Sequence, residues 1–155
     1  MNKKVVLVIL FILFSIGNVY NFASINENIT INLYKHSFAT YYANIDIEGV
    51  GKIRTMVDTG AGYTTINEVI LLQLIKQNKV KYVGKLKGVM ADGREINLSL
   101  YLVTIRIGKC VLENVEVAVF PYNTRTLLGL SVLGRFPSFK FDMKNSVLLF
   151  PRCPN

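Results

Sequence analysis

Residues 56–62 read Met-Val-Asp-Thr-Gly-Ala-Gly, which places one acidic residue between an apolar run and two glycines. Two interpretations fit Asp58. It could cap an ordinary turn, because Asp and Gly are common turn residues. It could also be a catalytic carboxylate that a rigid loop holds at the end of a strand. The pattern of the rest of the chain has to decide between these two interpretations.

The residues before this stretch predict a hairpin. Residues 40–47 are rich in aromatic and β-branched side chains, residues 48–51 contain two glycines and predict a turn, and residues 52–57 return as a second strand. The second strand ends at Asp58. The hairpin would therefore deliver the carboxylate to the start of the loop.

The residues after this stretch predict one helix and several more strands. Residues 67–77 are helix-like, because Asn67 suits an N-cap and acidic and basic residues stand at the matching ends. The apolar run at 127–130 contains Gly129, which predicts a close approach of two backbones. Further strands and turns are predicted over 95–107, 111–120, 139–141 and 146–150, and at 91–93, 108–109 and 142–145. The expected fold is all-β with one or two short helices, in a small barrel or sandwich.

Composition limits the possible functions. The chain has 155 residues, about half of them apolar, which is enough for one domain with a real core. Its net charge of +8 reflects 18 basic residues against 10 acidic ones, and aromatic residues do not interleave the basic ones, so we expect no nucleic-acid partner. The sequence has no HExxH motif and no phosphate-binding loop, and its two cysteines are too far apart for a zinc pattern. We therefore expect neither a metal nor a cofactor.

The two cysteines, Cys110 and Cys153, have three possible states. They could be separate thiols, an internal disulfide or a bridge between two chains. A disulfide is allowed if the protein is exported.

The N-terminus predicts export. Two lysines precede an unbroken apolar run over residues 5–14, as in a signal peptide, and a retained membrane anchor is the alternative. We expect residues 1–23 to be this leader, 24–37 a linker and 38–155 the folded domain. The domain would lie in the periplasm, or face it from an inner-membrane anchor.

The order of these motifs resembles that of the retropepsin-like aspartic proteases. Two apolar residues precede Asp-Thr-Gly-Ala, and a hairpin with a glycine at its tip, a pair of strands, Leu-Leu-Gly and a final strand follow. The chain is similar to single-domain bacterial members that carry an N-terminal membrane segment, and the resemblance extends from Tyr41 to Phe150. It implies a retropepsin-like β-barrel with one lobe per chain, and an aspartic endopeptidase that hydrolyses peptide or protein substrates.

The resemblance also implies roles for individual residues. Asp58 would be catalytic, with Thr59, Gly60 and Ala61 supporting the active-site loop. A flap that covers the substrate would be formed by Val89, Met90, Ala91, Asp92 and Gly93. An apolar element that packs under the loop would be formed by Leu127, Leu128 and Gly129.

Aspartic peptidases need two carboxylates that share one proton, whereas this chain has one Asp-Thr-Gly. Asp46, Asp92 and Asp142 stand in strand or turn contexts, so the second carboxylate would come from a second copy in a homodimer. Two alternatives remain open. The domain could be a catalytically silent retropepsin-like module that binds peptides in the envelope, or an unrelated structural β-fold in which Asp58 only caps a turn.

Overall fold

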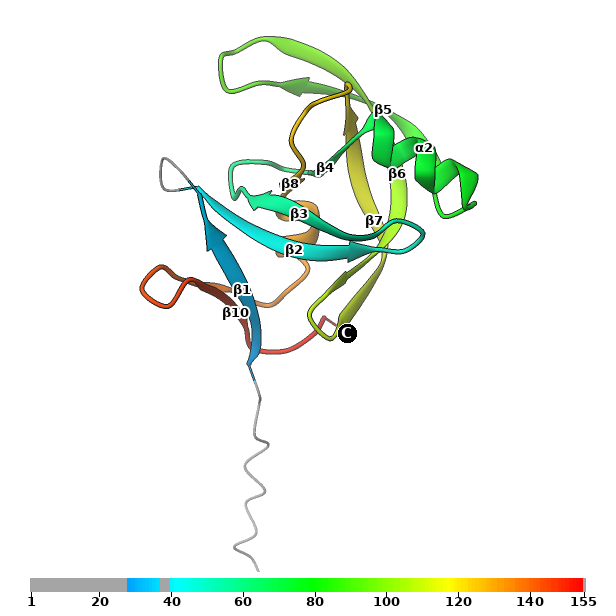
Figure 1. Ribbon diagram of the computed structural model, residues 1–155. Helices are drawn as coiled ribbons and strands as arrows, with labels where there is room; N and C mark the ends of the chain where they lie inside the picture. The colour runs from blue at the N-terminus through cyan, green and yellow to red at the C-terminus, as the bar shows by residue number, and fades with distance from the viewer. Residues whose placement is uncertain (1–27, 37–39, 155) are drawn as a thin grey trace, which may run out of the picture.

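The computed structural model of the protein describes residues 28–36 and 40–154, which form ten strands and two helices. The strands pair in the order β5-β6-β7-β4-β8-β3-β2-β1-β10-β9, and an added pairing of β6 with β2 closes the curved sheet in part (Figure 1). The elements are β1 (Ile29–Lys35), β2 (Tyr41–Ile47), β3 (Gly51–Val57), β4 (Thr64–Asn67), α2 (Glu68–Lys76), β5 (Lys81–Val89), β6 (Glu95–Ile107), β7 (Cys110–Phe120), β8 (Leu127–Leu128), α3 (Leu130–Leu133), β9 (Lys140–Asp142) and β10 (Val147–Phe150). The predicted all-β class with short helices is confirmed.

The hairpin before Asp58 has the predicted form. Strands β2 and β3 pair antiparallel, with Tyr42 opposite Met56 and Ile47 opposite Gly51. Ala43, Ile45 and Ile47 are buried on one face of β2, and the residues between them are half-buried. This period of two is what a sheet with one face on the core requires.

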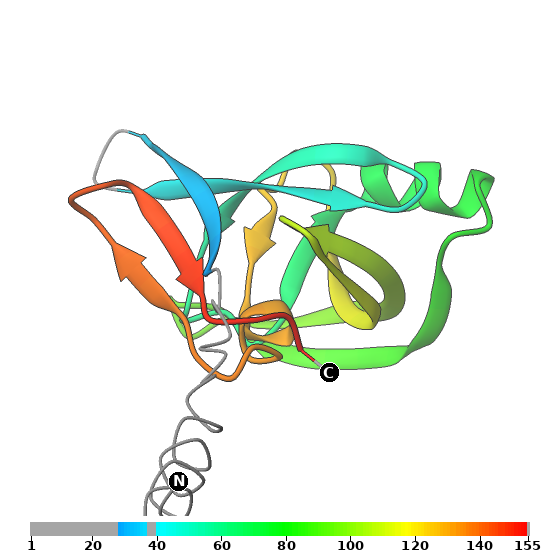
Figure 2. The ribbon, with the colours of Figure 1, turned by 90° about the horizontal axis from the view of Figure 1, so that it is seen from below.

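The predicted linker over 24–37 is wrong for Ile29–Lys35, which form strand β1. Ile29, Ile31 and Leu33 are buried, and β1 pairs with both β2 and β10. The apolar residues alternate with polar ones here, which is itself a strand pattern. The folded domain therefore begins before residue 38. In both views β1, β9 and β10 lie at one side of the molecule and α2 at the opposite side (Figures 1 and 2).

The predicted leader, residues 1–23, lies outside the described residues. Within residues 28–36 and 40–154, neither helix is long and apolar enough to cross a membrane.

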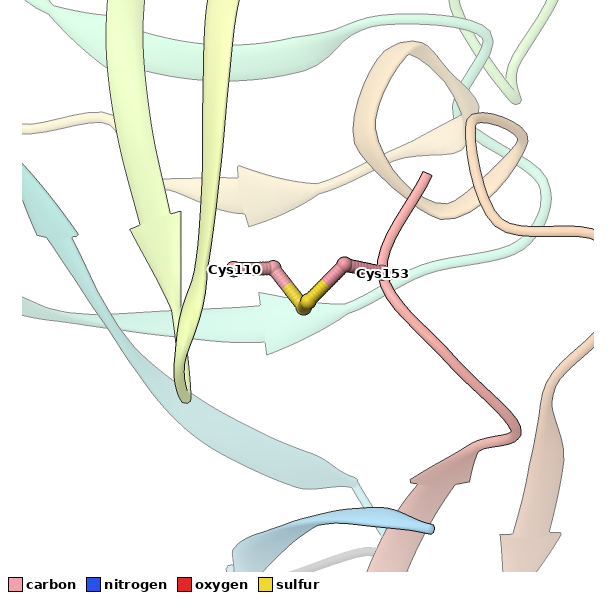
Figure 3. The surroundings of a disulfide bond; sticks show 2 residues. All are labelled: Cys110 and Cys153. Atoms are coloured by element: carbon pink, nitrogen blue, oxygen red, sulfur yellow. A yellow bond between two sulfur atoms is a disulfide. The ribbon is translucent and has the colours of Figure 1, made fainter. Parts of the chain in front are cut away.

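Of the three possible states of the two cysteines, the structure contains the internal disulfide. Cys110 begins β7 and is buried, Cys153 follows β10, and their Cα atoms are 5.4 Å apart. Figure 3 shows the bond joining the start of β7 to the segment after β10. Because the bond closes a separation of 43 residues, it should stabilise the fold by roughly 4 kcal/mol in the chain-entropy model.

The predicted helix is present as α2, and a strand that we did not predict precedes it. The Asn67 side chain caps α2 by accepting the Ile70 N–H at 3.1 Å. Strand β4 has only four residues and runs between β7 and β8. Its first three residues are all buried, so the apolar-polar alternation that identifies a strand is missing.

Candidate active site

The backbone of Asp58 continues the ladder between β3 and β8. Strand β3 runs parallel to β8, and the N–H groups of Met56 and Asp58 donate to the carbonyls of Thr126 and Leu128, at 3.0 and 3.1 Å. Asp58 therefore leaves the strand with its own amide still bound to β8. Its position is fixed by the sheet and not only by the loop.

The loop after Asp58 is also fixed where it returns to the sheet. Strand β4 pairs antiparallel with β8, so β8 lies between the strand that enters the loop and the strand that leaves it (Figure 1). The first two N–H groups after Gly129 donate hydrogen bonds to carbonyl groups of the loop. Leu130 donates to the Ala61 carbonyl at 2.9 Å, and Ser131 to the Gly62 carbonyl at 3.0 Å.

The side-chain hydroxyl groups of two threonines and one serine add further hydrogen bonds between β4 and the segment that runs from β8 into α3. The buried Thr64 Oγ1 accepts the Gly129 N–H at 3.1 Å, and the Ser131 Oγ accepts the Thr64 N–H at 2.9 Å. Thr65 Oγ1 accepts the Leu127 N–H at 2.9 Å. These three hydroxyl residues were not among those predicted from the sequence. The signal that could have found them is the pair of threonines just after the glycine-rich loop, since buried hydroxyls need partners.

Gly129 makes the close backbone approach that its position predicts. A Cβ atom at this position would lie 2.3 Å from the Tyr63 carbonyl oxygen and 2.7 Å from that of Ala61. No side chain fits there. The structure thus brings Leu127, Leu128 and Gly129 against the Asp58 loop.

Asp58 is a half-buried residue at the start of the loop. Its Oδ1 accepts the Gly60 N–H at 2.9 Å, which holds the side chain against its own turn. Thr59 and Gly60 are exposed, and the Thr59 hydroxyl has no hydrogen-bond partner within the described part of the chain. The loop therefore presents one oriented carboxylate, and one hydroxyl that binds no other described residue.

The other aspartates lie elsewhere in the fold. Asp46 stands opposite Lys52 at the far end of the β2–β3 hairpin. Asp142 accepts the Asn145 N–H at 3.0 Å in a turn, and this bond, with one from the Asn145 side chain, lowers the pKa of the Asp142 carboxyl. Among residues 28–36 and 40–154, no three His, Cys, Asp or Glu side chains cluster as metal ligands would.

The β5–β6 hairpin extends past the rest of the sheet, on the side where β3 ends (Figure 1). Its tip is a turn in which Met90 donates to the Arg94 carbonyl and Gly93 donates to the Met90 carbonyl, each at 2.8 Å. Val89 is 71% exposed. The Arg94 N–H, and then its guanidinium, hold the pKa of the Asp92 carboxyl below its usual value.

Two comparisons with known proteins agree with this geometry. A family model described as gag-polyprotein putative aspartyl protease matches residues 43–135, which is more than half of the chain and includes Asp58 and Gly129. A solved structure, of a retropepsin-like aspartic protease from Rickettsia conorii, is 26% identical and superimposes with a TM-score of 0.58. The match covers 79% of this chain and 89% of that one. No curated protein gives a significant match to the sequence. The chain therefore belongs to the family of gag-polyprotein putative aspartyl proteases and has the retropepsin-like fold.

Proposed function

We propose that the protein is an aspartic endopeptidase that acts as a homodimer, with Asp58 of each chain supplying one carboxylate of the catalytic pair. The observation that carries this proposal is the Asp58 loop. It orients one carboxylate through the Gly60 N–H, and β8 fixes the backbone on both sides. Asp46 lies at the far end of the β2–β3 hairpin, Asp92 at the tip of the β5–β6 hairpin and Asp142 in a separate turn. In this proposal the second carboxylate therefore comes from the other chain.

Two carboxylates that lie side by side cannot both be ionised comfortably, so they share one proton. The ionised carboxylate takes a proton from a water molecule as the water attacks the scissile carbonyl carbon, and the protonated one donates to the carbonyl oxygen. The roles then reverse, and the leaving amine receives a proton. Asp58 and its copy would perform both roles.

The surface of the loop supports a twofold contact. A homodimer with a twofold axis brings the same residue of both chains to that axis. Thr59 is exposed and its hydroxyl has no partner within the described residues, so it can bond to the backbone of the other loop. Gly60, beside it, has no Cβ to keep a substrate or the second chain away.

The β5–β6 hairpin is suited to cover a bound peptide. Its tip, Val89 to Gly93, extends from the sheet on the side where β3 ends, and it exposes the apolar Val89. A peptide side chain could bury this surface. In this proposal Val89, Met90, Ala91, Asp92 and Gly93 form the flap.

We also propose that the enzyme works in the bacterial cell envelope. Support comes from the predicted leader over residues 1–23 and from the Cys110–Cys153 disulfide, because disulfides persist in oxidising compartments. Retention of the leader would anchor the domain to the inner membrane, facing the periplasm.

The first test compares the full-length wild type with Asp58→Asn on a diverse peptide library from about pH 4 to pH 7.5, the range that brackets a carboxylate pair. Mass spectrometry would detect cleavage. We expect cuts by the wild type that Asp58→Asn does not make, while Asp46→Asn, the same chemical change on β2, cuts as the wild type does. Equal cutting by wild type and Asp58→Asn would refute the proposal.

Mixing tests whether two chains share the site. Random pairing of equal amounts of wild-type and Asp58→Asn chains leaves a quarter of the dimers fully wild type, so activity should fall to about half of that given by the same amount of wild-type chain alone. Unchanged activity would show that each chain works by itself.

A peptide-binding module without catalysis is the second candidate. Strand β5 is at the edge of the sheet, so its outer backbone groups could pair with an extended peptide. Peptide binding that survives Asp58→Asn, by a wild type that cuts nothing, would favour this candidate.

A further inference from the structure

A guanidinium group lies beside the strand that carries Asp58. Because side chains alternate along a strand and the ladder continues to Asp58, Met56 and Asp58 point to the same side of β3. Arg125 Nη1 lies 3.4 Å from the Met56 sulfur. The nearest strand residue to Asp58 on that face therefore touches a cation.

The segment that carries Arg125 is held at three points. Glu68 accepts the Tyr122 N–H at 3.2 Å, and the Asn67 side chain donates to the Thr124 carbonyl at 3.4 Å. Thr126 Oγ1 donates to the Arg54 carbonyl at 2.9 Å. Arg125 lies between the last two of these contacts with its side chain exposed, so the backbone fixes where the guanidinium can reach.

Arg125 has no anionic partner in residues 28–36 and 40–154. The ion pairs of this part of the chain are Lys79–Glu48, Lys87–Glu95 and Arg94–Asp92. The sulfur of Met56 is a weak acceptor and carries no charge. No ion pair within these residues therefore uses the charge of the guanidinium, and a bound group can approach it.

The surface next to Arg125 is apolar. Met56 stands opposite Leu127 in the parallel ladder, so their side chains share one face, and both are half-buried. A substrate side chain on this surface would meet two apolar side chains along its length and a guanidinium at its end. A glutamate fits this arrangement, because it has an aliphatic stem and a terminal carboxylate that Arg can bind through two parallel hydrogen bonds.

We infer that Arg125 is a specificity-determining residue that selects peptides with glutamate next to the scissile bond. The inference rests on the proposed function, since it assigns the substrate class of the Asp58 site. A twofold dimer has two copies of Arg125, one on each side of the scissile bond. The preference for glutamate therefore applies on either side.

The test compares full-length wild type, Arg125→Gln and Arg125→Glu on sets of peptides that differ only by Glu, Gln or Lys next to the cut. We expect the wild type to have a kcat/KM about three- to fivefold higher for the Glu peptide, the size expected of an ion pair at an exposed side chain. Arg125→Gln should remove this preference, and Arg125→Glu should shift it to Lys peptides.

Arg106→Gln is the matched control. It removes the same charge from β6, next to Asp46 at the far end of the β2–β3 hairpin, and should keep the preference for Glu. If Arg106→Gln and Arg125→Gln lose the preference for Glu equally, the inference is overturned, because the preference would then depend on the net charge of the protein.

Binding to Asp58→Asn separates the failure of this inference from that of the proposed function. Glu and Gln peptides would be titrated against Asp58→Asn with and without Arg125→Gln. A wild type that cuts peptides without preferring Glu overturns the assignment of Arg125 and leaves the endopeptidase in place. A wild type that cuts nothing, together with binding of Glu peptides that depends on Arg125, overturns both the endopeptidase and the placement of glutamate at a scissile bond, and leaves Arg125 as a glutamate-binding residue of a peptide-binding module. If the wild type cuts nothing and Glu peptides are not bound selectively, both the proposed function and the assignment of Arg125 are wrong.

Discussion

The Asp58 loop and the β5–β6 hairpin tip face the same side of the fold but are built differently. The loop is held by hydrogen bonds to residues more than sixty positions away in the sequence, as between Thr64 and Ser131, and by buried hydroxyls. The hairpin tip is held by contacts within its own turn. Its ion pairs, Arg94–Asp92 and Lys87–Glu95, have exposed side chains.

The difference separates a part that must keep its geometry from a part that can change it. A buried hydrogen bond is costly to break, because both groups lose a partner away from water. An exposed ion pair contributes little, because water and salt screen it. In the proposed enzyme the catalytic carboxylate thus has a rigid support, whereas the cover can open for a peptide.

The largest expected effect comes from a methyl group under the loop. Gly129→Ala would place a Cβ 2.3 Å from the Tyr63 carbonyl oxygen, and a backbone atom cannot rotate away as a side chain can. We expect a loss of about 3 kcal/mol or more in the free energy of unfolding, measured by denaturant titration. Gly62→Ala is the control, because a methyl group at that position would have no atom within 4 Å. A similarly small loss of unfolding free energy in both variants would contradict the close approach of Gly129 to the loop backbone.

The second effect concerns one hydrogen bond of the loop. Thr64→Val keeps the shape of the side chain but leaves the Gly129 N–H without its acceptor, and a buried donor without a partner costs about 1–3 kcal/mol. Denaturant titration would measure this loss. Thr30→Val makes the same change on the exposed face of β1 and should change stability by less than about 0.5 kcal/mol. Equal effects would mean that the hydroxyl does not support the loop.

The sequence was sufficient to predict the parts of the fold that have a local signal. The β2–β3 hairpin alternates over its length and has glycines at its turn, and α2 carries its own N-cap at Asn67. Strand β1 has the same alternation, although the predicted linker covers it. Strand β4 could not be identified, since burial on both faces removes alternation from so short a segment.

The site could be predicted only as far as the Asp-Thr-Gly motif. Thr64, Ser131 and Gly129 act together because β4 and β8 become neighbours in the sheet, and no spacing in the sequence shows that pairing. The role inferred for Arg125 was not predictable for the same reason. Its position beside Met56 follows from the parallel pairing of β3 with β8.

The hairpin should respond to a glycine change more in motion than in stability. Gly93 has a φ of +82°, which other residues adopt at a cost of about 1–2 kcal/mol, but a methyl group there would meet nothing within 4 Å. Gly93→Ala should therefore speed hydrogen exchange at the tip and change kcat/KM, while the amides of the Asp58 loop exchange as before. Faster exchange in the loop would show that the two regions open together.

The smallest expected effect is an electrostatic one at the hairpin tip. The pKa of Asp92 is below its usual value of 3.8, first because its carboxylate accepts the Arg94 N–H and second because it accepts from the Arg94 guanidinium. A carboxyl with a lowered pKa stabilises the folded turn above the usual value, and this stabilisation disappears as the pH falls through the lowered one.

Arg94→Gln removes only the second cause. An NMR titration of the Asp92 carboxyl in this variant should still give a pKa below 3.8, although closer to it than in the wild type. A complete return to the usual value would mean that the side-chain pair, not the backbone of the turn, orders the tip. In that case salt should loosen the hairpin, since exposed pairs are screened, and the contrast between a rigid loop and an adaptable cover would depend on ionic strength.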